Sequence, residues 1–177
     1  FLGADLLPAP NIVFTRFLHE IQQEALLFHT SVTLGRVLLS FVIAMLIGIA
    51  LGLVMGSSQH ADQFLDPWLV FFLNIPALVV IILAYMWLGL NEVAAIGAVA
   101  INKIPNVIVT IREGVRARDI NLMNMAKVYE LSRWKSFRHV LLPQLLPYLA
   151  ASSRSGISLI WKIVLVVELL GRSNGIG

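Results

Sequence analysis

The sequence contains no cysteine, so disulfide bonds and thiolate metal sites are excluded from this chain. Charge is also scarce: 13% of the residues are charged, 58% are hydrophobic, and the mean hydropathy is +0.85. Soluble domains carry about 25% charged residues, so this chain has too little polar surface to cover a globule in water. The composition predicts an integral membrane protein. With the long uncharged runs described below, we expect the all-α class, a single polytopic helical bundle over residues 1–177.

Motifs for catalysis and nucleotide binding are absent as well. The sequence has no Gly-x-x-x-x-Gly-Lys-Ser/Thr loop for ATP phosphates, no His-Glu-x-x-His and no Gly-x-Ser-x-Gly. The four histidines show no metal-ligand spacing: His19, His29, His60 and His139. We therefore expect no catalytic residue, no metal site and no cofactor in this chain.

Long uncharged runs predict membrane-spanning helices. The nineteen residues from Val37 to Met55 carry no charge, which is enough to cross a hydrocarbon core of roughly 30 Å. A later run is interrupted by Arg154, Lys162 and Glu168, which a span tolerates if they face the bundle interior, snorkel or pair. The four expected spans are 31–56, 67–90, 93–111 and 143–170.

Small residues inside the first span predict a packing face. Gly48, Gly52 and Gly56 recur at every fourth residue, which aligns them on one side of a helix where another backbone can approach closely. The alternative is that glycine is simply common in membrane helices.

Polar residues inside the spans are candidates for the solute pathway or for ion pairs. Lys103 lies near the middle of a span, where a charge is expensive, and Asn74 interrupts another span. The alternative for Lys103 is that it snorkels or pairs with Glu168. Glu168 and Arg172 are four residues apart in the order that favours a helical ion pair.

The N-terminal region differs from the spans because apolar and charged residues alternate at helical spacing. We expect an amphipathic helix over 11–28 that lies at the membrane surface. The chain begins with Phe1 and ends at Gly177 directly after an apolar run, and we expect both ends to be cuts through a longer protein.

Basic residues concentrate in one predicted loop, 112–142. It holds seven of the thirteen Lys and Arg residues, whereas the turn 89–92 holds none. By the positive-inside rule this loop faces the cytoplasm. Within it, Asp119 and Ser132 can cap two short helices, from Ile120 to about Leu131 and from Arg133 to about Leu142. Such helices suit either anionic lipid headgroups or a groove on a soluble partner, and physical reasoning alone leaves both readings open.

The stretch NMAKVYELSRWKSFRHVLLP, residues 124–143, resembles the cytoplasmic EAA loop of binding-protein-dependent ABC importer permeases. That pattern runs Glu-Ala-Ala, three residues, Gly, nine residues, an apolar residue, one further residue and Leu-Pro. Ala126, Val140, Leu142 and Pro143 agree with it. LLPAPNIV, TLGRVLLSF, LDPW and GVRARD resemble the family too, most closely its nitrate, taurine and sulfonate branch.

Three positions depart from the family pattern. Asn124 and Met125 replace Glu and Ala, and Glu130 replaces Gly. A glycine would permit a sharp bend between the two helices. With Glu130 we expect the bend to be softer or to move to Leu131 and Ser132.

The resemblance implies a permease fold, an ATPase-binding loop and a set of partners. The residues it implies for ATPase coupling are Asn124, Met125, Ala126, Tyr129, Glu130, Leu142 and Pro143. The implied partners are an ABC ATP-binding subunit, which binds ATP and Mg, a second permease chain in a homodimer, a periplasmic or lipid-anchored solute-binding protein, and membrane lipids, with no nucleic acid. The implied location is the bacterial inner membrane.

Two other functions are compatible with the composition. A secondary transporter or channel would need coupling residues inside the spans, where Lys103, Lys162 and Glu168 are available. A structural membrane protein would use the basic loop to bind lipid alone. Co-purification of an ATP-binding subunit distinguishes the importer from both.

Overall fold

A computed structural model describes residues 9, 10, 12 and 25–177, and within this part every regular element is helical. The helices are α2 (Ala25–Ser57), α3 (Gln59–Asn74), α4 (Ala77–Leu88), α5 (Glu92–Arg116), α6 (Ile120–Val128), α7 (Arg133–Ser136), the π-helix η1 (Phe137–Leu141) and α8 (Leu142–Gly171). The all-α prediction is confirmed.

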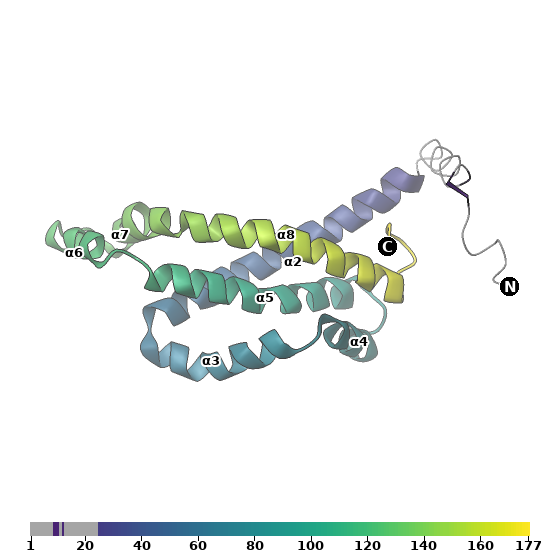
Figure 1. Cartoon of the computed structure of the whole chain (residues 1–177), viewed down its shortest axis with the longest axis horizontal. Coiled ribbons are helices and arrows are strands. Elements are labelled where there is room, and N and C mark those ends of the chain that lie inside the picture. The colour runs from purple at the N-terminus through teal and green to yellow at the C-terminus, as the bar shows by residue number, and fades with distance from the viewer. Residues whose placement is uncertain (1–8, 11, 13–24) are drawn as a thin grey trace.

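Helices α2, α5 and α8 form the centre of the bundle (Figure 1). Their shared core contains Val37, Val99, Ile160 and Val164, each at most 5% exposed. Most large apolar side chains outside this core are exposed, as expected for a chain whose outer surface meets lipid rather than water. The same figure shows α3 running beside α5, whereas α6 and α7 extend beyond one end of the bundle.

The three glycines of the predicted stripe lie against α5. A Cβ atom added at Gly48 would stand 2.5 Å from Cβ of Val107, one at Gly52 2.8 Å from Cβ of Ile111, and one at Gly56 2.6 Å from Cβ of Val115. Each of the three added Cβ atoms would be too close to α5. Glycine has only a hydrogen atom as its side chain, and this allows α2 and α5 to pack at the observed separation.

The expected continuous span 67–90 is wrong in one respect, because the structure divides it. Helix α3 begins at Gln59, eight residues before the expected start of the span, and ends at Asn74, and α4 follows at an angle of 94°. Pro76 lacks an N–H group and pushes Ile75 into an extended conformation, with φ −77° and ψ 123°. The pair forms a broken span or a re-entrant loop.

Two described helices are long and apolar enough to cross a membrane by length and composition, α2 from Leu26 and α5, and the bent pair raises this number to three. Helix α5 continues to Arg116, so the predicted loop 112–142 begins one turn later than expected. Helix α8 has 30 residues but carries Arg154, Lys162 and Glu168. A fourth span therefore stays a prediction.

The expected N-terminal amphipathic helix, 11–28, lies mostly outside the described residues. Its last four residues, 25–28, belong to α2 in the structure.

The expected boundary at Pro143 is corrected by the structure. Ser136, Phe137, Leu141 and Leu142 all have right-handed helical backbone angles, so α7, η1 and α8 form one uninterrupted rod. The rod widens to a π-helical turn just before Pro143, and the N–H of Leu142 donates to the carbonyl of Phe137. A wider turn accommodates the proline ring and its missing donor without ending the helix.

Candidate functional site

The segment from Asp119 to Leu131 is held at both ends by local hydrogen bonds. The carboxylate of Asp119 accepts from the N–H of Asn121 at 2.7 Å and caps α6, as its sequence position predicts. The N–H of Asp119 itself donates to Oε1 of Gln144 on α8, also at 2.7 Å. The start of α6 is thereby fixed to the first turns of α8.

Glu130 ends α6 in a left-handed conformation, with φ +49°. The N–H of Leu131 donates to the carbonyl of Ala126, and the N–H of Glu130 donates to the carbonyl of Lys127, both at 3.0 Å. These two bonds define a Schellman motif, in which glycine is the usual residue at the left-handed position. The expected softer or displaced bend is therefore wrong: the sharp bend stays at position 130, and glutamate adopts it.

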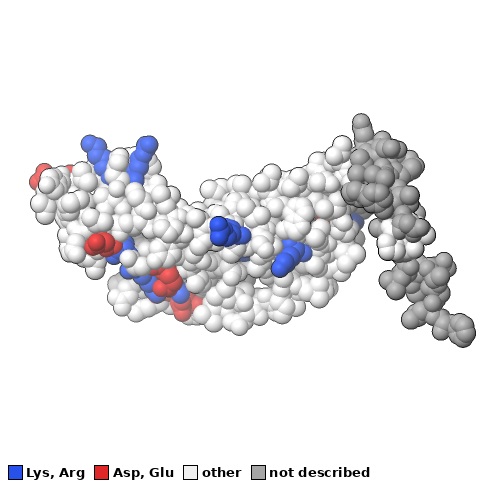
Figure 2. Space-filling model, turned by 45° about the horizontal axis from the view of Figure 1, so that its top comes forward, with Lys and Arg blue, Asp and Glu red and all other residues white. Residues whose placement is uncertain are grey.

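The side chains of α6 are mostly exposed. Ala126 is 2% exposed, whereas Tyr129 is 73% exposed and Val128 is 80% exposed. Met125 is 46% exposed, and Asn124 and Glu130 are exposed too. Exposed apolar side chains on a short helix, flanked by the basic residues that project near that end in Figure 2, are typical of a surface that binds another protein.

The remaining predicted coupling residues lie on the rod. Ser132 caps α7 by accepting from the N–H of Lys135 at 3.4 Å, and the rings of Trp134 and Phe137 stack with centroids 5.9 Å apart. Leu142 is half-buried and Pro143 is exposed at the start of α8. These two residues position the rod, and α6 carries the exposed apolar surface.

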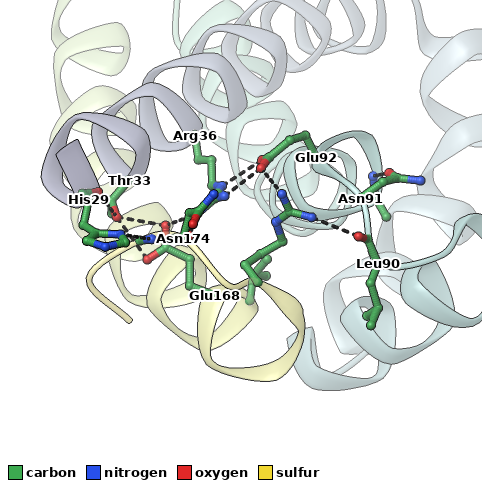
Figure 3. Close-up of polar contacts among 12 residues, drawn as sticks. His29, Thr33, Arg36, Leu90, Asn91, Glu92, Glu168 and Asn174 are labelled. Carbon is green, nitrogen blue, oxygen red and sulfur yellow. Dashed lines mark hydrogen bonds and ion pairs between the residues drawn. The ribbon is translucent and has the colours of Figure 1, made fainter. Parts of the chain in front are cut away.

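At the opposite end of the bundle, charged side chains of α2, α5 and α8 form an ion-pair network (Figure 3). Nη1 of Arg36 lies 2.6 Å from Oε1 of Glu168, and both side chains are buried, at 3% and 1% exposure. Nε and Nη2 of Arg36 contact the two oxygens of Glu92 at 2.8 and 2.7 Å. One guanidinium therefore joins three helices.

The expected ion pair between Glu168 and Arg172 is wrong. Arg172 pairs with Glu92 instead, and its Nη1 donates to the carbonyl of Leu90 at 2.9 Å. Helix α8 ends at Gly171, and Arg172 has an extended backbone, so the i,i+4 geometry is lost. The carboxylate of Glu168 is bonded by Arg36, the hydroxyl of Thr33 and the N–H of Gly177.

Sequence reasoning missed Arg36, Thr33 and Glu92 as members of this network. Arg36 stands one residue before the uncharged run of the first span, and Glu92 stands at the start of another. The sequence signal that could have indicated this network is the presence of opposite charges at the ends of two spans, because a buried arginine needs a carboxylate partner.

The two candidate pathway residues differ in their surroundings. Lys103 is 2% exposed, and its Nζ contacts Oγ of Ser155 at 3.4 Å, so the alternative pairing with Glu168 is not formed. Asn74 is exposed at the end of α3 and donates to the carbonyl of Val70 at 2.7 Å. Asn74 thus marks the break between α3 and α4.

Residues 44–177 match the family model described as binding-protein-dependent transport system inner membrane component. The chain belongs to this family. The match covers the glycine stripe, the bent helix pair, α6 and the rod, and it confirms the family resemblance found in the sequence.

Relatives within the family include permeases named for several solutes. The chain is 32% identical over 177 residues to the aliphatic sulfonates transport permease SsuC of Escherichia coli, covering 100% of this chain and 67% of that protein. It is 29% identical to SsuC of Bacillus subtilis, and the match covers 99% of this chain and 64% of that protein. It is 30% identical to the bicarbonate transport permease CmpB of Synechocystis, and that match covers 83% of this chain and 52% of CmpB. The chain thus spans about two thirds or less of these relatives.

The fold also occurs in a solved structure of an amino acid ABC transporter with histidines. The two chains align with a TM-score of 0.70 over 93% of this chain and 78% of the other, at 20% sequence identity. At this identity the likeness establishes the fold alone.

Proposed function

We propose that this chain is the membrane-spanning permease subunit of an ATP-driven importer, and that α6 couples it to a separate ATPase. The observation that carries the proposal is the exposed apolar surface of α6, with Tyr129 73% and Val128 80% exposed on a helix fixed by Asp119 and Glu130. Short apolar anchors presented from a rigid base suit a groove on a partner protein.

The proposed partners follow from membership of the family. The ATP-binding subunit supplies the ATP and Mg sites, since this chain has no phosphate-binding loop. Two copies of the permease form the pathway, and a solute-binding protein delivers solute to the outer side. The basic residues between 112 and 142 support a location of α6 on the cytoplasmic side of a bacterial inner membrane, by the positive-inside rule.

The proposed solute is a small anion. Relatives are named for aliphatic sulfonates and for bicarbonate, both of which carry negative charge. Lys103 is a proposed pathway residue because a buried cation near the middle of a span favours an anion. Asn74 is the second proposed pathway residue because it brings an exposed polar side chain to the break between α3 and α4.

The test of ATPase coupling is a charge placed on the apolar surface of α6. Tyr129→Arg in the full-length permease should reduce co-purification of the ATP-binding subunit at least tenfold, because a guanidinium would have to be desolvated in an apolar groove. The measurement is the molar ratio of the two subunits after detergent purification.

The matched control is Gln59→Arg, which adds the same charge at an exposed position at the start of α3. It should leave the subunit ratio unchanged. Absence of any ATP-binding subunit with the parent protein, or equal binding by Tyr129→Arg, would favour a channel or secondary transporter.

A further inference from the structure

Helix α8 carries an exposed polar stripe that the family assignment does not explain. Arg154, Ser155, Ser158 and Lys162 are all exposed, and at about 100° per residue they fall within about 100° of arc on one side of the helix. Figure 2 shows two separate blue patches over the middle of the molecule, away from the red surfaces. We name these four residues the α8 stripe.

The α8 stripe lies level with the middle of α5, one of the described helices that are long and apolar enough to cross a membrane. Ser155 contacts Lys103, the twelfth of the 25 residues of α5, so the two helices define a common level. At 1.5 Å per residue, Glu92 lies about 16 Å from this level and Glu113 about 15 Å on the other side. Arg154 stands at the same level, and Lys162 about 10 Å toward the outer end.

Positive charge at this depth has no acidic partner among the described residues. Helices α2 and α4 contain no Asp or Glu, and the carboxylates of α5 and α8 lie near helix ends. Within the described part of the chain Arg154 and Lys162 make no ion pair or side-chain hydrogen bond. Lys103 has one long contact, with Ser155.

Lipid is a poor environment for the α8 stripe. A single Arg or Lys at the centre of a span costs about 2.5–3.5 kcal/mol on insertion scales, and Arg154 is level with the middle of α5. The stripe therefore faces water or a partner. A second copy related by twofold symmetry would bring the same cations to the opposite side, because an isologous interface presents identical surfaces. A second copy would therefore add its own positive charges to the region in front of the α8 stripe.

We propose that the α8 stripe lines the solute path and binds a small oxyanion between two copies of the chain. The guanidinium of Arg154 matches an oxyanion in a bidentate geometry. Ser158 supplies a hydroxyl donor, and Lys103 adds a buried positive charge behind Ser155. The inference rests on the proposed permease function and adds the residues that select the solute by charge.

The test uses cysteine labelling in the full-length permease purified with its ATPase, since this part of the chain contains no cysteine. The probes are the anionic 2-sulfonatoethyl and the cationic 2-trimethylammonioethyl methanethiosulfonates. Each labelling rate is divided by the rate of that reagent with 2-mercaptoethanol. The ratio of the two corrected rates removes any change in thiol pKa, which affects both reagents equally.

Ser158→Cys should react at least ten times faster with the anionic reagent, and adding Arg154→Gln should reduce this preference at least fivefold. Arg154→Lys should keep most of it. Gln59→Cys, at an exposed polar position at the start of α3, is the control and should show no preference for the anionic reagent. If Ser158→Cys does not fold, Ala151→Cys on the same face replaces it.

Equal rates with both reagents, a preference for the cationic one, or no reaction at either cysteine would overturn the inference. Its failure is distinct from failure of the proposed function. Loss of the ATP-binding subunit from the parent complex would contradict the ATPase coupling, whereas the labelling ratio reports only on the charge around the α8 stripe.

Discussion

Glu130 adopts a backbone conformation that glycine reaches without steric cost. Its φ of +49° lies in the left-handed region, where a Cβ atom costs roughly 1–2 kcal/mol. The two Schellman bonds from Leu131 and Glu130 fix this conformation against that cost. Strain of this kind is maintained by surrounding contacts, and it lies next to the proposed ATPase surface.

Glu130→Gly should therefore stabilise the end of α6 by up to about 1 kcal/mol, because part of the steric gain is offset by the greater freedom of glycine in the unfolded chain. The expected result is amide exchange of Leu131 slowed by up to about fivefold, measured by hydrogen exchange with mass spectrometry. Glu130→Ala keeps the Cβ atom and should show no slowing. Faster exchange in Glu130→Gly would contradict the strain argument.

Arg36 is the residue on which the ion-pair network of α2, α5 and α8 depends. Arg36→Met would leave the carboxylate of Glu168, 1% exposed, without its cation, and removing one partner of a buried pair costs about 3–5 kcal/mol. The variant should unfold at a clearly lower temperature in detergent, followed by tryptophan fluorescence.

The double variant Arg36→Met with Glu168→Leu should recover at least half of that loss, because no charge is then left buried without a partner. Arg172→Met is the control. This change removes a contact to Glu92, which is 46% exposed and can be solvated by water. The free energy of unfolding should therefore fall by about 1 kcal/mol or less. Equal losses of stability in Arg36→Met and Arg172→Met would show that the burial of the Arg36–Glu168 pair has no special effect on stability.

At the scale of elements, the close contact between α2 and α5 depends on glycines, which have no Cβ atom. Gly52→Ala would place a Cβ atom 2.8 Å from Cβ of Ile111 and 3.0 Å from the carbonyl of Ile108. Overpacking of this kind costs about 1–3 kcal/mol, so the unfolding temperature should fall.

Gly35→Ala is the matched control in the same helix. An added Cβ there has nothing within 4 Å, and alanine is the better helix former by about 1 kcal/mol, so stability should stay equal or rise. A fall in unfolding temperature with Gly35→Ala as large as that with Gly52→Ala would show that the glycine stripe has no packing role.

The elements that the sequence predicts well are those governed by local chemistry. Asp119 and Ser132 cap their helices because a side-chain oxygen and a free N–H lie two or three residues apart in the sequence. The division of 67–90 at Pro76, by contrast, could be expected only as a kink, since the 94° angle depends on what α4 packs against. The continuity of the rod through Pro143 was missed because a π-helical turn has no simple sequence signal.

At the scale of the whole molecule, composition alone predicts the membrane class, and the family match confirms the permease fold. Pairing between distant residues could not be predicted. Arg36 and Glu168 are 132 residues apart, and only the assembled bundle brings α2 and α8 together. A local rule assigned Glu168 to Arg172 because that spacing is visible in the sequence, whereas burial favours the partner that the fold supplies.

The uninterrupted rod has a mechanical consequence. From Arg133 to Gly171 it measures about 58 Å at 1.5 Å per residue, and Tyr148 presses against Gly114 of α5, where an added Cβ would lie 2.6 Å from Cγ of Tyr148. A pivot at this contact would divide the helix into two arms. The arm from Arg133 to Tyr148 would be about 22 Å long and the arm from Tyr148 to Glu168 about 30 Å. A rigid rotation about that pivot would move Glu168 in the direction opposite to α7, by about a third more.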